Sequence, residues 1–378
     1  MSDSQPSVWP AEPHTRAKHQ ILQAYLSAWM AILSRQSHNL GATENRIKYV
    51  DGFAGPGVYE KGEKGSPVLA LEAALNHNVS FPVPVELIFI ENDIERFGIL
   101  KAQLTKYADQ VARSTNVRAV KPIHGDCRVV LDQMLDAADK RTNKFGPALV
   151  FLDQFGYSAV PMELIGRVLS HGQCEVLTYL FWRDLDRFIT DPHKHQGIST
   201  AFGCGDWEPA ISLPAGQRER FMLRTYMQSL RNRARAEYVW PFAMLDQNER
   251  LLYWLFFCTN NIRGLYQMKR AMWKVDQTGG FTFNDKDGFG QLKFLTAYTD
   301  EQLAKDMERE LAGRTMRVGE VEVWVLAHTP AYKFKAPLAA MERRGTVKAM
   351  NPPPSRHGGK FPDDDMLVQF ALPALFNF

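Results

Sequence analysis

The chain has 378 residues, enough for one large domain with a small one, or for two medium-sized domains. Hydrophobic residues make up 45% and charged residues 23%, as in ordinary globular proteins, and a net charge of +3 gives no overall nucleic-acid signal. The cysteines are scattered without a Cys-x-x-Cys pair, which argues against a zinc site and favours a reducing cytoplasm. The longest wholly apolar run, residues 251–258, is too short for a membrane span, and the polar N-terminus is unlike a signal peptide.

A first helix is predicted from about Thr15, because apolar residues recur at helical spacing as far as Leu33. Its first turn is crowded with basic side chains: His14, Arg16, Lys18 and His19. Basic residues at this end oppose the helix dipole. Either the helix end is simply solvated, or these side chains cover a cofactor or contact an anionic substrate.

A strand, a glycine loop and a helix follow between residues 47 and 75. The strand ends at Asp51, glycines fall at 52, 55 and 57, and Ser66 is expected to cap a helix that has Pro67 in its first turn. This unit is typical of the cofactor half of a doubly wound α/β domain. Neither a P-loop nor a dinucleotide fingerprint is present.

The spacing Asp51-x-x-x-Gly55-x-Gly57 is instead the first-loop pattern of S-adenosylmethionine (SAM) methyltransferases. SAM has a cationic sulfonium and an amino acid tail but no pyrophosphate, so its loop needs a carboxylate more than a phosphate nest. The alternative is a glycine turn that binds no ligand.

Further acids follow the next predicted strands. Glu91 closes the strand from Val85 and could accept hydrogen bonds from a ribose, although it could equally be a helix-start acid. Asp126 follows the strand predicted at 117–123 and could accept from an adenine amino group, or belong to a plain turn. Asp153 follows the fourth strand, residues 148–152, where methyltransferases place substrate chemistry.

A fifth strand at 174–181 and an antiparallel pair at 242–245 and 251–258 complete the pattern. Five βα-type units with a terminal hairpin are the SAM-methyltransferase plan. We therefore expect a Rossmann-like α/β domain over residues 1–295, with a helical insertion at about 182–236. Residues 281–290 should form a loop at the domain junction. Residues 296–378 should form a winged-helix domain of three helices and a β wing. Its second helix, at 318–327, has valines that also alternate as in a strand, and its third helix should begin at Thr329 or Pro330.

Basic residues are concentrated in three places, although the overall charge is small. The insertion helix carries arginines between 218 and 235, and a helix at 262–274 has Arg263, Lys269, Arg270 and Lys274. Aromatic residues are interleaved, a combination that suits RNA or single-stranded DNA, whereas the alternative is a solvated amphipathic face. The excess of positive charge at 331–360 suits a phosphate backbone, although winged helices also bind proteins.

Long collinear motifs resemble the three-Cys-motif partner (TcmP) proteins, a family similar to SAM methyltransferases. They are the segments 14–19, 49–57, 65–67, 89–91, 151–157, 259–261 and 268–273. The resemblance implies SAM binding by the loop residues Asp51, Phe53, Gly55 and Gly57 with Glu91 and Asp126. It also implies a partner protein encoded nearby, which bears the cysteines of the family's name.

The family's fourth motif reads Asp-Pro-Phe-Gly and is similar to the motif of enzymes that methylate base amines. It implies that Asp153 orients an amine, with Phe155 or Tyr157 stacking on the base, although Gln154 replaces the proline. We expect a SAM-dependent methyltransferase acting on an amine of a nucleic acid base. The alternatives are a scaffold that supports a partner enzyme, and methylation of a protein or small molecule.

Overall fold

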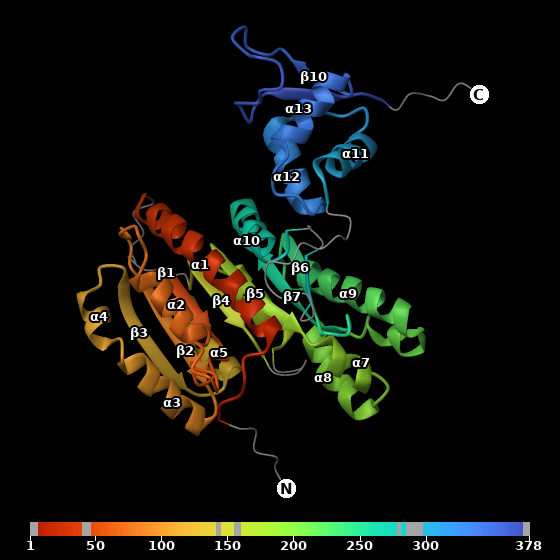
Figure 1. Ribbon diagram of the computed structural model, residues 1–378. Helices are drawn as coiled ribbons and strands as arrows, with labels where there is room; N and C mark the ends of the chain where they lie inside the picture. The colour runs from red at the N-terminus through yellow and green to blue at the C-terminus, as the bar shows by residue number, and fades with distance from the viewer. Residues whose placement is uncertain are drawn as a thin grey trace. The chain divides into compact units, whose positions relative to one another are not determined.

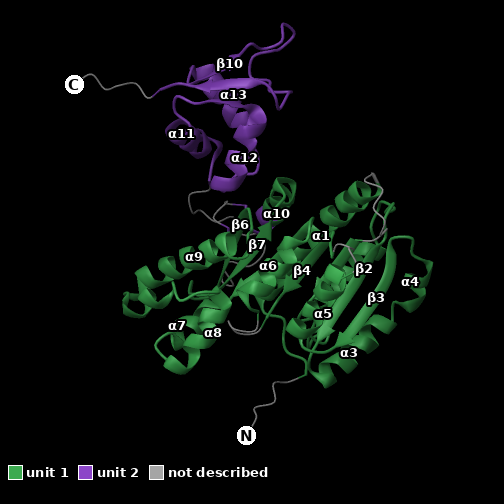
Figure 2. Cartoon of the chain, turned by 180° about the vertical axis from the view of Figure 1, so that it is seen from behind, with its two compact units in different colours: residues 1–271, 282–290 green, residues 272–281, 291–378 purple. Residues whose placement is uncertain are grey.

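The computed structural model describes residues 7–39, 47–140, 145–154, 160–277, 281–284 and 298–372. The chain divides into two compact units (Figure 2). Unit 1 comprises Met1–Ala271 and Thr282–Gly290, and unit 2 comprises Met272–Phe281 and Gln291–Phe378. The predicted domain boundary, between residues 295 and 296, falls outside the described residues.

Unit 1 is built on a mixed sheet whose described strands follow the order β3-β2-β1-β4-β5-β7-β6-β8 (Figure 1). Neighbours from β3 to β5 run parallel, and β7 is antiparallel to both β5 and β6. The strands are β1 (Ile47–Asp51), β2 (Val85–Glu91), β3 (Val117–His124), β4 (Ala148–Leu152), β5 (Cys174–Leu180), β6 (Tyr238–Leu245), β7 (Leu251–Thr259) and β8 (Thr282–Asn284). The predicted α/β class with a mostly parallel sheet is confirmed, and the arrangement is compatible with a Rossmann-like fold.

One strand contradicts the prediction. A loop was expected over residues 281–290, yet residues 282–284 form β8, which pairs with β6. The strand has only 3 residues, too few for an alternating pattern to show in the sequence.

Helices cover both faces of this sheet, and α1 contacts α2 while α5 contacts α6. Figure 1 shows α1 and α2 in front of the sheet, and Figure 2, from behind, shows α5 and α6. The helices of this part of the chain are α1 (Pro13–Asn39), α2 (Ser66–Leu75), α3 (Ile94–Thr105), α4 (Ala108–Arg113), α5 (Cys127–Lys140), α6 (Met162–Ser170), α7 (Trp182–Phe188), α8 (Pro192–Phe202), α9 (Ala215–Asn232) and α10 (Ile262–Val275), with a 3-10 turn, η1 (Glu208–Ser212).

Mostly apolar runs explain the central strands, although Glu86 in β2 and Glu175 in β5 are buried within them. Every residue of β2, β4 and β5 is buried, as expected for parallel strands covered on both faces. The helical insertion shares this core, because Trp182, Phe202, Trp207 and Tyr226 belong to the same hydrophobic cluster as Val150 of β4. Each fully buried large side chain contributes about 1.5–3 kcal/mol, so the insertion stabilises the sheet that carries it.

Unit 2 has its own core and a separate sheet with the order β10-β11-β9. Its described elements are α11 (Asp300–Glu310), β9 (Thr315–Arg317), α12 (Val318–His328), α13 (Lys335–Arg344), β10 (Val347–Met350) and β11 (Leu367–Phe370). Residues 318–327, which could be helix or strand by their pattern, form helix. The predicted third helix begins at Lys335 rather than at Thr329 or Pro330, because Thr329 is the C-cap residue of α12, with its amide and hydroxyl both bonded to the Val325 carbonyl.

None of the helices in the described parts of the chain is both long and apolar enough to cross a membrane.

Candidate functional site

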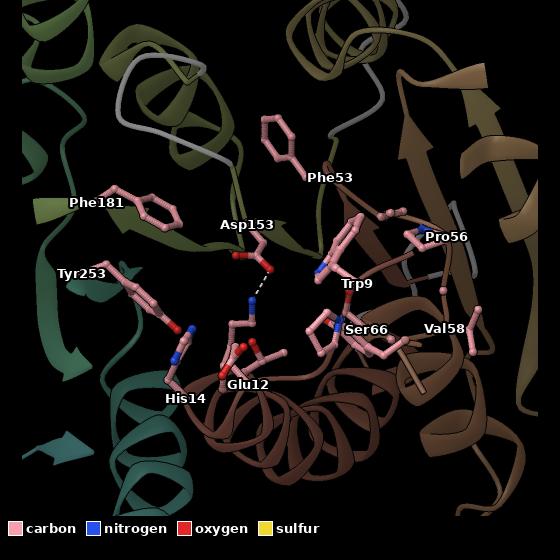
Figure 3. A pocket seen from close by; sticks show the side chains of 18 residues that line it. Trp9, Glu12, His14, Phe53, Pro56, Val58, Ser66, Asp153, Phe181 and Tyr253 are labelled. Carbon is pink, nitrogen blue, oxygen red and sulfur yellow. Dashed lines mark hydrogen bonds and ion pairs between the residues drawn. The ribbon is translucent and has the colours of Figure 1, made fainter. Parts of the chain in front are cut away.

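A cavity of about 200 Å³ lies at the carboxyl ends of β1 and β4 (Figure 3). The sheet grows from β1 towards β3 on one side and from β4 towards β5 on the other, so this is its topological switch point. Ligands of doubly wound proteins bind at such a point, outside the carboxyl ends of the strands. The walls come from the glycine loop, the N-terminal segment with α1, Asp153, and the aromatic residues Phe181 and Tyr253.

The glycine loop needs its glycines for two separate reasons. Gly55 and Gly57 have positive φ angles of 61° and 72°, which residues with a Cβ rarely adopt. At Gly65 the constraint is space, because an added Cβ would lie 2.9 Å from the carbonyl carbon of Gly57. The Gly65 amide donates to the Gly57 carbonyl oxygen at 2.9 Å, which closes the loop against itself.

Asp51 is completely buried at the end of β1. Its Oδ2 accepts from the Ser66 hydroxyl at 2.7 Å, and its Oδ1 accepts from the Phe53 amide at 3.3 Å. Burial raises the pKa of Asp51 to about 7, against the opposing effect of the Ser66 hydrogen bond. The prediction that Ser66 caps α2 was wrong: Gly65 is the N-cap residue, and the Ser66 hydroxyl turns to the buried acid instead.

Glu91 fixes the glycine loop to the end of β2. Its Oε2 accepts from the Gly55 amide and its Oε1 from the Asp93 amide, both at 2.8 Å. Asp93, not Glu91, is the capping residue of α3. Because a carboxylate oxygen has two acceptor positions, each oxygen keeps capacity for one further donor, which is what a ribose contact would need.

The remaining predicted SAM residues divide between the cavity and the surface. Phe53 lines the cavity beside Gly55 and Gly57. Asp126 does not line it: this residue is exposed and accepts from the Val129 amide at 3.2 Å, at the start of α5. Asp51 and Glu91 hold the loop but do not themselves line the cavity. Asp126 lies at the start of α5, outside the lining, and its contact with an adenine stays a prediction.

Asp153 faces the cavity and forms an ion pair with Lys18 of α1, shown by the dashed line in Figure 3. The side chains are 9% exposed for Lys18 and 19% for Asp153. The Lys18 ammonium also lies over the Tyr179 ring, 5.4 Å from its centroid. Phe155 and Tyr157, predicted to stack on a substrate, lie outside the described residues.

Gln154 is buried and joins both ends of the segment that follows β4. Its Nε2 donates to the Tyr179 carbonyl at 3.2 Å, and its Oε1 accepts from the Val160 amide at 2.8 Å. A proline at this position could make neither side-chain bond. Gln154 thus anchors the backbone next to Asp153 to β5.

Sequence reasoning missed three residues that line the cavity: Trp9, Phe181 and Tyr253. His14 and Lys18 also line it, and they belong to the crowded basic turn that was predicted either to be solvated or to cover a cofactor. The neighbouring His19 is also buried, and burial together with the Lys18 charge lowers its pKa to about 3, so it stays neutral.

Trp9 lies against the glycine loop. Its carbonyl accepts from the Glu60 amide at 3.0 Å, and its ring meets the Tyr59 ring edge-on. A Cβ on Gly55 would lie 3.7 Å from the Trp9 ring. The N-terminal segment therefore forms the wall opposite the backbone of Gly55.

Three of the basic residues assigned to possible nucleic-acid surfaces instead make contacts within their own unit. Lys269 is buried with its ammonium 3.4 Å from the centroid of the Trp240 ring, and burial lowers its pKa well below the usual value. Arg218 donates to Asp186 at 2.8 Å. Arg356 forms a two-armed pair with Glu342, at 2.9 and 2.7 Å. These three side chains were wrongly assigned to a binding surface.

No group of three or more histidine, cysteine or acidic residues among those described could hold a metal ion. Comparison of the sequence with protein-family models and with curated proteins gave no match. The similarity to three-Cys-motif partner proteins is therefore a prediction, and the cavity's own geometry has to support any function.

Proposed function

We propose that this chain is a SAM-dependent methyltransferase that methylates an amine. One observation carries the proposal: a glycine loop held between the buried acids Asp51 and Glu91 shares a cavity with Asp153 at the switch point of the sheet. The five parallel strands followed by the antiparallel pair β7 and β6 also follow the plan expected of a SAM-methyltransferase sheet.

The residues present fit this cofactor. Asp51 has no bonded lysine or arginine in the described parts of the chain, and a nearby cationic ligand would favour its carboxylate form over the protonated form that burial favours. The free acceptor positions of Glu91 suit ribose hydroxyls, and the loop backbone at Gly55 and Gly57 carries no side chain that would block a ligand. When bound, SAM supplies an electrophilic methyl group.

Asp153 would act on the acceptor. Its carboxylate accepts a hydrogen bond from the amine, turns the nitrogen lone pair towards the methyl group, and takes up the proton that the amine loses. The shielded position of Asp153 strengthens this electrostatic interaction relative to water. Positioning of the two reactants in such a site supplies most of the rate enhancement.

A nucleic acid base is the acceptor that the charge pattern favours. Arg220, Arg224 and Arg231 are exposed on α9 at the i, i+4 and i+11 positions, which places them along one face of the helix. In unit 2, the order of three helices and a three-stranded sheet supports a winged helix, on which Arg343 and Lys348 are exposed. Exposed cations of this kind contact phosphates.

The cofactor is tested by calorimetry with SAM and S-adenosylhomocysteine, comparing the wild type with Gly55→Val. We expect micromolar binding by the wild type and none by the variant. Gly62→Val is the matched control, because Gly62 also has a positive φ but no atom lies within 4 Å of an added Cβ. No heat in the wild type would refute SAM binding, and equal loss in both variants would refute a specific role of Gly55.

The nucleic-acid target is tested by reversing the charge of the three α9 arginines. Binding to single-stranded RNA or DNA should weaken, and the slope of log affinity against log salt should fall by about one for each phosphate that the protein no longer neutralises. Lys101 and Lys106, exposed on the opposite edge of the sheet at α3, provide the control reversal. An unchanged salt slope would leave a protein or small-molecule amine as the target.

A second candidate function is a methyltransferase-fold scaffold that supports a partner protein encoded nearby. The observation that favours it is the small size of the cavity. Its volume of about 200 Å³ lies below the usual range for ligand pockets, about 300–1,000 Å³, and the Asp153 carboxylate is already paired with Lys18. An Asp153→Ala variant that binds S-adenosylhomocysteine and keeps its cellular role would favour the scaffold; loss of methylation would favour the enzyme.

A cytoplasmic location fits this function, because Cys127, Cys174, Cys204 and Cys258 are all free thiols and such thiols persist in a reducing compartment. Fractionation of cells that express the tagged chain tests it.

A further inference from the structure

Lys18 stands where the proposed reaction needs an amine. Its Nζ donates to Oδ2 of Asp153, the carboxylate assigned to orient the acceptor nitrogen. Among the described residues that line the cavity, Lys18 is the only lysine or arginine. We propose that Lys18 is a modification site: the chain transfers a methyl group to Nζ of its own Lys18. This inference rests on the proposed function and names an acceptor within the chain itself.

Three features of the contact suit an amine acceptor. The nitrogen is hydrogen-bonded to an acid that can receive its proton. The Lys18 side chain is 9% exposed, so little water competes for the methyl group. Beneath the ammonium lies the face of Tyr179, at 5.4 Å from the centroid, and aromatic faces favour methylated ammonium groups.

The position of Lys18 within α1 directs it into the cavity. Ala17, Lys18 and His19 are all buried, although they belong to the basic first turns of the helix. By contrast, the neighbouring Arg16 is exposed and pairs with Glu63 outside the cavity. The helix therefore holds one cation inward and one outward, and only the inward side chain reaches Asp153.

The reaction balances without a further reagent. Lys18 first passes a proton from its ammonium to Asp153, which already accepts its hydrogen bond. The freed nitrogen lone pair forms the new N–C bond while the S–C bond of the donor breaks, and that bonding pair stays on sulfur. Asp153 then releases the proton to solvent, so that one proton leaves for each methyl group transferred.

The product state has a structural consequence. One or two methyl groups leave Nζ with a positive charge and an N–H, so its pair with Asp153 is kept. Three methyl groups keep the charge but remove every N–H donor. Full methylation would therefore free the acceptor positions of Asp153 for an external amine.

The test uses the full chain and SAM that carries a deuterated methyl group. Intact mass and peptide mapping, with a protease that cuts at acidic residues, locate the label. We expect it on Lys18, at a rate that does not depend on protein concentration. Asp153→Asn should slow labelling by about 100-fold while binding of S-adenosylhomocysteine stays within a few-fold of the wild type. Lys18→Arg keeps the charge and should abolish the label at this position.

Lys64 is the internal control, because it is also paired with an acid, Glu72, but its side chain is 50% exposed. Equal label on Lys64 and Lys18 would indicate chemical methylation and overturn the proposal. So would a rate that rises with protein concentration, or an unlabelled Lys18 in a chain that binds S-adenosylhomocysteine. In that last case SAM binding stands and Lys18 is only a counter-ion; absence of binding would remove the proposed function itself.

Discussion

The two sides of the cavity are built differently. On the glycine-loop side, residues 51–66 contact one another and are tied to the neighbouring strand by Glu91. On the Asp153 side, the contacts join elements that are distant in the chain: Lys18 of α1, Asp153 after β4, Tyr179 of β5 and Tyr253 of β7. One side is held mainly by backbone geometry, and the other by charges and aromatic rings.

This difference separates what is rigid from what can change. The Gly55 amide is bonded to Glu91 and the Gly65 amide to Gly57 without any ligand, so this part of the loop is preorganised. On the Asp153 side, Lys18 is paired with the acid. An incoming amine would have to displace Lys18, unless Lys18 is itself the amine that reacts. We therefore expect substitutions in the loop to change stability and cofactor binding together. Substitutions around Asp153 should act mainly through the charge balance of the cavity.

Asp51 gives the largest expected effect, on the glycine-loop side. The folded chain keeps the Asp51 proton up to about pH 7, whereas the unfolded chain releases it near the ordinary pKa of 3.8. The free energy of unfolding should therefore fall as pH rises through this window. At about 1.4 kcal/mol per pKa unit, the fall is about 4 kcal/mol. Asp51→Asn should remove this fall, as measured by urea denaturation from about pH 4 to pH 8.

The contributions of other titrating groups cancel when the wild type is compared with Asp51→Asn. Glu175 also has its pKa raised to about 7 by burial, so it gives a fall of the same sign in both proteins. Asp153 and Lys18, the charged groups that act on Asp51 from across the cavity, are present in both. Parallel stability curves for wild type and Asp51→Asn would show that Asp51 does not carry the effect.

Lys18→Met tests the charge balance of the Asp153 side. The variant leaves Asp153 largely shielded without its cation, and breaking such a pair costs about 3 kcal/mol. Adding Asp153→Asn to Lys18→Met should recover most of the loss, because no uncompensated charge is then left. Arg16→Met is the control: its pair with Glu63 is half exposed and should cost about 0.5 kcal/mol. Additive losses in the double variant would contradict the pairing.

Gly65→Ala tests the backbone geometry of the loop. The added methyl group would meet the backbone of Gly57 at 2.9 Å, and backbone atoms cannot move aside as a flexible side chain can. We expect a loss of about 2 kcal/mol by denaturation. Gly98→Ala is the control, because Gly98 lies within α3 with no atom from the rest of the described chain within 4 Å of an added Cβ, and the variant should gain stability from the better helix former. Equal effects in the two variants would refute the steric argument.

The same division explains how much the sequence could predict. β1, the glycine loop and β2 follow from apolar runs, glycine spacing and strand-end acids, all patterns within short stretches. Parallel strands place Glu91 at the same edge of the sheet as the glycine loop, although its bond to the Gly55 amide was not predicted. The pairing of Lys18 with Asp153 does not, because it depends on how α1 docks on the sheet, and helical periodicity alone treats a lysine as exposed. Ser66 was misassigned because a buried acid competed for its hydroxyl.

Substitution of Gln154 gives the smallest expected change in stability. It tests how firmly the backbone next to Asp153 is held to β5. Gln154→Met keeps the side chain's volume but loses the bonds to the Tyr179 carbonyl and the Val160 amide. We expect a loss of about 1 kcal/mol, mainly from the buried Val160 amide left without its acceptor. Hydrogen exchange should rise at Val160 while amides of β4 and β5 stay protected.

This result bears on the reaction as well as on stability. Gln154 adjoins Asp153, so a looser anchor would let the carboxylate sample more orientations, and a displacement of about 1 Å can cost 100-fold in rate. Methylation should therefore fall by more than the stability loss suggests, with cofactor binding unchanged because the glycine loop is untouched. If cofactor affinity fell in step with methylation, the two sides of the cavity would be coupled, and the distinction between a rigid loop and an adjustable acceptor side would fail.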